Sequence, residues 1–181
     1  MLLNRTVVDL LDAGSATLCH VSELVLVFVP LSRYELVQLS SGEPLACPRT
    51  GYCASAQLKD TFGLDDDEEA EFAALQVASV ACLTRQSERV VVTAKLPESQ
   101  VRPGADAING EVQVARLELA DVEAVFTDDD PRVANNAAQA VAGYDLDAAW
   151  SAPEVQQLLG ERDLLWHSVA EMGSLAGRAA R

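Results

Sequence analysis

Five consecutive carboxylates at residues 65–69 have the clearest potential for chemistry in this sequence. Carboxylate oxygens are the ligands that Mg²⁺ and Ca²⁺ prefer, so such a run can contribute to a metal site. It lacks the alternating ligand spacing and the central glycine of an EF-hand loop, however. The alanine-rich segment 70–83 follows directly, and acidic side chains in a first turn stabilise a helix through its dipole. We therefore interpret the run first as the start of a long helix.

A carboxylate cluster that serves a metal-assisted hydrolase is the alternative. Glu68 and Glu71 lie on adjacent positions of the expected helix, and they could meet Asp128 or Asp129 where the last expected strand ends. No histidine accompanies these side chains at ligand spacing, and helix capping and strand-end turns explain them without a metal. We therefore expect no metal site, no cofactor and no catalytic residue, and the hydrolase is the runner-up hypothesis.

The histidines and cysteines suggest little further chemistry. His167 could act as a general base or a metal ligand, although a packed or surface histidine is the simpler interpretation, and His20 is assigned no role. Cys53 would need a lowered pKa and a nearby base to act as a nucleophile, and the sequence shows neither. Cys82 is expected in the core. Motifs for phosphate loops, dinucleotide binding, serine hydrolases and zinc proteases do not occur in the sequence.

Large apolar side chains gather near the C-terminus, in a region otherwise rich in alanine. They are Trp150, Leu164, Leu165 and Trp166. Their simplest role is to seat the C-terminal helices on a sheet. Otherwise they form an exposed patch for a protein partner or for a second copy of the chain.

Composition limits the partners of the protein. The net charge is −15, and the arginines are scattered singly, so direct binding to nucleic acid or to an anionic membrane is disfavoured. The longest apolar run, 24–31, is too short to span a bilayer. The spacing of the four cysteines fits reduced thiols, and we expect a cytoplasmic protein. Abundant alanine and an excess of arginine over lysine are typical of a GC-rich, bacterial genome.

The hydrophobic pattern predicts an α+β fold with a mixed β-sheet of about four or five strands, helices packed on it, and C-terminal helices. Strands are expected at residues 24–29, 51–55, 89–96, 111–117 and 121–127. Helices are expected at residues 33–40, 65–86, 132–142, 153–159 and 163–172. Ser32 and Glu35 predict a capping box for the first of these helices. In the long helix, one buried face is expected to contain Phe72, Leu75, Ser79, Cys82 and Leu83.

The chain is expected to form one domain. Residues 1–23 are expected to be an N-terminal extension, with a short amphipathic helix at 5–12. Residues 24–172 form the single α+β domain, and residues 173–181 form a frayed tail.

Several segments, taken in order, resemble a family of small actinobacterial proteins that carries a domain-of-unknown-function label. These segments are Val27–Pro30, Asp67–Leu75, Arg89–Val92, Leu119–Asp129 and Leu164–Met172. The resemblance covers about residues 25–172 and implies no activity and no site. It implies that the family begins at the strand 25–30, which leaves residues 1–24 as either the product of a misassigned start codon or a real appendage.

Together these observations favour an acidic, cytoplasmic interaction or regulatory protein without catalytic activity. A basic protein would suit its charge as a partner, and a homodimer is a second arrangement that the apolar cluster allows. The alternatives are the metal-assisted hydrolase and an acidic DNA mimic that blocks a nucleic-acid-binding protein.

Overall fold

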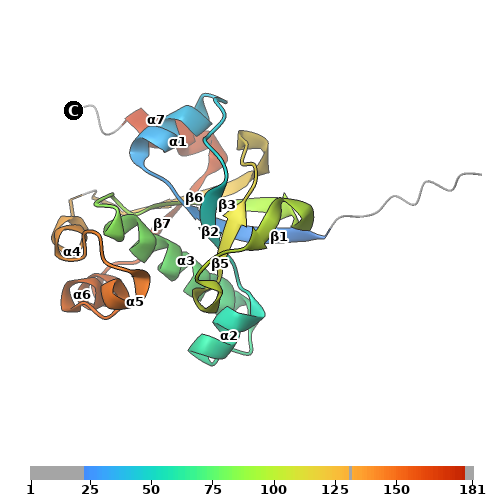
Figure 1. Cartoon of the computed structure of the whole chain (residues 1–181). Coiled ribbons are helices and arrows are strands. Elements are labelled where there is room, and N and C mark those ends of the chain that lie inside the picture. The colour runs from blue at the N-terminus through green and yellow to red at the C-terminus, as the bar shows by residue number, and fades with distance from the viewer. Residues whose placement is uncertain (1–22, 131, 178–181) are drawn as a thin grey trace, which may run out of the picture.

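One seven-stranded antiparallel sheet organises the protein (Figure 1). The computed structural model describes residues 23–130 and 132–177. Across the sheet the strand order is β4-β5-β2-β1-β3-β6-β7. The strands are β1 (Leu24–Pro30), β2 (Arg49–Tyr52), β3 (Val90–Pro97), β4 (Val101–Pro103), β5 (Glu111–Val114), β6 (Val122–Thr127) and β7 (Leu165–Ser168). The α-helices are α1 (Arg33–Ser40), α2 (Ala56–Phe62), α3 (Asp67–Thr84), α4 (Asn135–Ala140), α5 (Leu146–Trp150), α6 (Pro153–Glu161) and α7 (Met172–Gly177). Short 3-10 helices lie at Glu98–Gln100, Ala107–Asn109, Leu119–Asp121 and Val169–Glu171.

The expected α+β class, with helices packed on a sheet and a C-terminal helix, is confirmed. The sheet is wider than the four or five strands expected, and its pairings are antiparallel rather than mixed. Both edge strands, β4 and β7, have only three or four residues and therefore carry almost no periodic signal. The connection through α1 returns β2 antiparallel to β1. The longer connection through α2 and α3 is a crossover between β2 and β3, which run in the same direction but lie on either side of β1 and therefore do not pair with each other.

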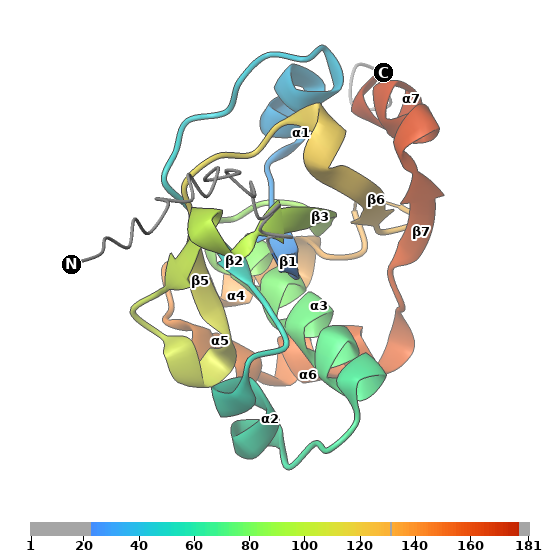
Figure 2. The ribbon, with the colours of Figure 1, turned by 90° about the vertical axis from the view of Figure 1, so that its right-hand side faces the viewer.

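Helices cover both faces of the sheet (Figure 2). On one face, α1 and α7 pack over alternate residues of the central strands, including Val27 and Val29 of β1. On the other face, α3 packs against Phe28 of β1 and Val91 of β3. A further layer of α4, α5 and α6 covers the outer side of α3. The sheet therefore has two cores, and α3 is the helix that both the sheet and the outer layer bury.

This sandwiched position corrects the expected burial of the long helix. Residues 73–83 of α3 are buried on all sides rather than along a single face. Phe72, expected on the buried face, is instead 56% exposed. Phe72 lies in the first half of α3, beside hollows in which neither the sheet nor the outer layer covers its ring completely.

The acidic run is the beginning of α3, as its position predicts. Asp66 is the N-cap, and its Oδ1 accepts hydrogen bonds from the backbone N–H groups of Glu68 (2.8 Å) and Glu69 (3.0 Å). The expected capping box of α1 is also present, since Ser32 Oγ accepts from the Glu35 N–H and the Ser32 N–H donates to Glu35 Oε2. Local side-chain chemistry therefore sets where these two helices begin.

The C-terminal part differs from the expected helix at residues 163–172. This segment contains β7, which pairs with β6 in a register that places Trp166 opposite Phe126. Leucine and alanine give the segment a helical propensity, and pairing with an available sheet edge overrides it. The helix α7 then includes residues 173–177 of the expected tail, and its Leu175 is 3% exposed. Residues 178–181, the extension up to residue 22 and His20 lie outside the described residues.

None of the helices in the described ranges has both the length and the apolar character needed to cross a membrane.

Candidate functional site

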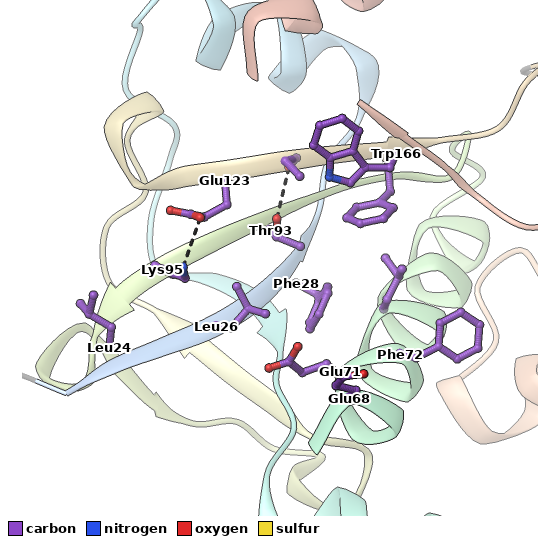
Figure 3. A pocket seen from close by; sticks show the side chains of 13 residues that line it. Leu24, Leu26, Phe28, Glu68, Glu71, Phe72, Thr93, Lys95, Glu123 and Trp166 are labelled. Carbon is purple, nitrogen blue, oxygen red and sulfur yellow. Dashed lines mark hydrogen bonds and ion pairs between the residues drawn. The ribbon is translucent and has the colours of Figure 1, made fainter. Parts of the chain in front are cut away.

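A groove of about 960 Å³ lies between the N-terminal half of α3 and the open part of the sheet (Figure 3). It exists because α3 packs against β1, β2 and β3, whereas β6 and β7 extend beyond it. The lining residues are Leu24, Leu26, Phe28, Glu68, Glu71, Phe72, Leu75, Thr93, Lys95, Glu123, Ala124, Phe126 and Trp166. The groove thus joins side chains from one helix and four strands.

The floor of the groove is apolar. Leu24, Leu26 and Phe28 alternate along β1, so they share the face of the sheet that α3 partly covers. Phe126 of β6 continues this floor, and Trp166 stands opposite it on the edge strand β7. Trp166 is 61% exposed, which makes its indole ring one wall of the groove.

The rim of the groove carries net negative charge. Glu71 projects from α3 toward the groove (Figure 3), and Glu68, one turn earlier, also lines it. Across the sheet, Lys95 Nζ and Glu123 Oε2 form an ion pair at 3.3 Å, and both side chains are half exposed. Three carboxylates therefore face one ammonium group, a local charge of −2. A ligand that combines apolar surface with positive charge suits this arrangement.

The candidate metal ligands are not brought together. Val90 pairs with Thr127, so Asp128 follows β6 at the end of the sheet where α3 terminates, and Cys82 Sγ lies 3.4 Å from Val90 O there. Glu68 lies fourteen residues before Cys82 along the helix, which corresponds to about 21 Å. Among the described residues, no group of three or more histidine, cysteine or acidic side chains has a geometry that could hold a metal ion.

Asp128 and Asp129 instead bind arginines. Asp128 accepts hydrogen bonds from Nε and Nη2 of Arg89, and both side chains are almost fully buried. Asp129 lies 3.5 Å from Arg162 at an exposed position. The carboxylates that the hydrolase hypothesis places in one site therefore belong to two ends of the molecule.

The apolar cluster expected near the C-terminus is divided. Leu165 and Trp166 are exposed on β7, at 46% and 61%. Leu164 is half-buried against the core under α3. Trp150 packs edge-on against Phe62, with ring centroids 5.6 Å apart, on the other side of α3. Trp166 alone of these four residues lines the groove.

The remaining potentially reactive side chains, Cys53, Cys82 and His167, lie in environments typical of structural residues. Burial raises the pKa of the Cys53 thiol, and it raises that of Cys82 to about 11, so both thiols are protonated near neutral pH. His167 Nε2 lies 3.0 Å from Thr127 Oγ1, across the pairing of β7 with β6. None of these three side chains lines the groove.

Sequence reasoning missed Phe72, Phe126 and the β1 side chains as site residues. The alternation at residues 24, 26 and 28 is visible in the sequence, but a strand buried on both faces shows no polar side. Which of these β1 side chains remain accessible to solvent depends on how much of the sheet α3 covers, and this is visible only in the tertiary structure.

The fold and the site define an α+β protein with an antiparallel sheet that α3 covers only in part, and with a groove that has an apolar floor and a negatively charged rim. Residues 25–176 match the model of a family of unknown function, DUF6912, and the chain belongs to this family. Searches against curated proteins and against solved structures give no significant match.

Proposed function

We propose that the protein is a non-catalytic interaction protein that binds a basic, amphipathic segment of a protein partner in the groove. The observation that carries this proposal is the combination of an exposed apolar floor with a rim of net negative charge. Actinobacterial origin and a cytoplasmic location, which the sequence favours, belong to the same proposal.

The apolar part of the groove supports a macromolecular partner. Leu24, Phe72 and Trp166 are each more than half exposed, yet they line the same depression. Contiguous exposed apolar surface of this kind is unfavourable in water and marks interaction sites in soluble proteins. Aromatic side chains at the centre of an interface also contribute a large share of the binding free energy.

The negative charge of the groove favours a partner with positive charge. Glu68 and Glu71 extend from α3 beside the apolar floor, where lysine or arginine side chains of a partner could pair with them. The net charge of −15 adds a long-range attraction that accelerates encounter with a basic partner and weakens as salt is added. A second acidic copy of the chain would meet repulsion instead, which argues against the homodimer at this surface.

A catalytic use of the groove has less support. The carboxylates of its lining stand on the rim, and the candidate metal ligands Asp128 and Asp129 lie at the far end of α3. The buried thiols of Cys53 and Cys82 are not activated nucleophiles.

The test compares partner capture by matched variants in an actinobacterial lysate. Wild-type protein and Tyr144→Ala, which truncates an exposed aromatic outside the groove, are expected to retain the same basic protein. The double variant Leu24→Ala/Trp166→Ala, which changes two exposed side chains of the groove that do not line the second hollow beside α3, is expected to lose it. A titration of the purified partner should then show affinity that falls as salt rises.

Retention of the partner by the groove variant would overturn the proposed site. Affinity that is independent of salt would overturn the electrostatic part of the argument. Under the DNA-mimic hypothesis the captured protein would bind nucleic acid, and added DNA would displace it from the wild-type chain.

A further inference from the structure

A second pocket, of about 690 Å³, adjoins the groove along the first half of α3, and Glu68 and Phe72 line both hollows. Its walls come from the end of α2, the loop that leads into α3, the first half of α3, and α5. The lining residues are Phe62, Leu64, Asp66, Glu68, Glu69, Phe72, Ala73, Gln76 and Trp150. The volume is in the range of pockets that hold small ligands.

Gln76 is the unusual residue of this pocket. It is 8% exposed, and its side-chain Oε1 has no hydrogen-bond partner within the described part of the chain. A buried acceptor without a partner costs free energy, and its neighbours on α3 are apolar side chains such as Ala73 and Val77. A buried amide oxygen without a partner in a pocket wall is explained if a bound molecule donates an N–H or O–H to it.

The walls of the pocket are largely aromatic. Phe62 and Trp150 meet edge-on, at an interplanar angle of 74°. Phe72 contributes a ring that is 56% exposed, and Leu64 completes the apolar surface. Aromatic faces attract organic cations through the ring quadrupole, and they also bury the apolar body of such a ligand.

The polar rim of the pocket is acidic. Asp66, Glu68 and Glu69 line it, and none of the lining residues is basic. The backbone N–H groups of Glu68 and Glu69, which would otherwise attract an anion to the start of α3, already donate to Asp66. The remaining field therefore favours a positive ligand.

We propose that this pocket binds a small organic cation, a protonated amine or guanidinium carried on an apolar body. The cationic head lies among the rim carboxylates and donates a hydrogen bond to Gln76 Oε1. The apolar body packs against Phe62, Phe72 and Trp150. This site does not depend on the proposed function of the groove, because Gln76, Phe62 and Trp150 line the pocket and do not line the groove.

The experiment uses phenethylamine and agmatine as probes, with 2-phenylethanol as the neutral counterpart of phenethylamine. In a Trp166→Phe chain, the tryptophan fluorescence reports Trp150 alone, which lies in the pocket wall. Both cations are expected to change this fluorescence saturably, and 2-phenylethanol is expected to bind at least tenfold more weakly. The same titrations by calorimetry on the wild-type chain provide a second readout.

Variants of the pocket assign the binding to the named side chains. Glu69→Gln, at an exposed position that leaves the core intact, and Gln76→Leu, which removes the amide, should each raise the Kd for phenethylamine at least tenfold. Glu123→Gln, which changes a carboxylate of the groove instead, should leave it unchanged. A far-UV circular dichroism spectrum and a thermal transition verify that each variant is folded.

Several outcomes would overturn the proposal. The first is a Trp150 fluorescence that shows no saturable change up to 10 mM amine, and the second is binding of 2-phenylethanol as tight as that of phenethylamine. The third is a Kd for phenethylamine that is unchanged in both pocket variants, which would leave water as the partner of Gln76. Binding of an arginine-containing peptide in the absence of any binding of the free cations would assign the pocket to a protein side chain, and the small-ligand proposal would be wrong.

Discussion

Replacement of Asp128 by asparagine should destabilise the protein strongly, because it removes the counter-charge of a buried arginine. Arg89 directly precedes β3 and is 0% exposed, and Asp128 directly follows β6 and is 8% exposed. Nε and Nη2 of Arg89 both donate to the Asp128 carboxylate, and Nη2 also donates to the Arg162 carbonyl at 3.2 Å. The pair closes the end of the sheet where α3 terminates.

The magnitude follows from the burial of both partners. Breaking a buried ion pair by removing one charge costs about 3–5 kcal/mol, since the remaining charge stays in a medium of low polarity. Asparagine keeps one acceptor oxygen but turns an N–H donor toward the guanidinium, so the full cost is expected. For a chain of 181 residues this corresponds to a fall in Tm of roughly 6–20 °C.

The assay is urea unfolding followed by far-UV circular dichroism, with Asp129→Asn as the matched control. Asp129 is half exposed and lies 3.5 Å from Arg162, so its replacement should change the free energy of unfolding by less than about 0.5 kcal/mol. The double replacement Arg89→Met/Asp128→Leu removes both charges and should recover most of the stability. A loss below about 1 kcal/mol for Asp128→Asn, at an unchanged m-value, would refute the reasoning.

Four further predictions concern the acidic helix start, the thiols, acid stability and metals. Asp66→Ala should cost about 1 kcal/mol in urea unfolding, because it removes the cap of α3, whereas Asp66→Asn should cost less; a loss of several kcal/mol in the asparagine variant would show that the carboxylate binds something. Mass-spectrometric mapping of iodoacetamide labelling should find Cys47 modified in the native protein and Cys53 and Cys82 modified only after unfolding, since the last two are buried with raised pKa values; native labelling of Cys53 would contradict its burial. Burial raises the pKa of Glu35, but hydrogen bonds from Ser32 and Arg49 outweigh it and leave this pKa below its usual value. The stability that Glu35 contributes is therefore present above about pH 4.5 and is lost as the pH falls. Urea unfolding at a series of pH values should show that the free energy of unfolding falls less steeply toward acid in Glu35→Gln than in the wild type, and an identical fall in both would remove Glu35 as the cause. Millimolar Mg²⁺, Mn²⁺ or Ca²⁺ should raise the Tm only slightly and without selectivity, through screening of the net charge of −15, and a large shift with one ion that Glu71→Gln abolishes would restore the hydrolase hypothesis.

Local features of the fold were predictable because they depend on neighbouring residues. The capping box of Ser32 and Glu35 satisfies backbone N–H groups within four residues, and it begins α1 as expected. The acidic run begins α3 for the same reason, through Asp66. Continuous β-branched and aromatic segments became β1 and β3, since such residues suit strands that are buried on both faces.

Long-range contacts decided the remaining features. The composition of residues 165–168 gives no local signal for a strand. They form one because β6 presents an unpaired edge with which they can pair. The carboxylates of Glu71 and Asp128 lie at opposite ends of α3 because β6 runs antiparallel to β3, a pairing that sequence spacing does not reveal.

The sequence by itself determined the charge of the protein, its α+β class, the caps of α1 and α3, and the main strands, because each depends on composition or on contacts within a few residues. The tertiary structure alone decided that Phe72 and Trp166 face one groove and that Gln76 lies in an aromatic pocket. The physical reason is that the groove forms where α3 leaves part of the sheet uncovered, and the pocket forms where α2 and α5 leave part of α3 uncovered. How far each helix covers its neighbour depends on the packing of elements that are distant in sequence, and no local pattern encodes it.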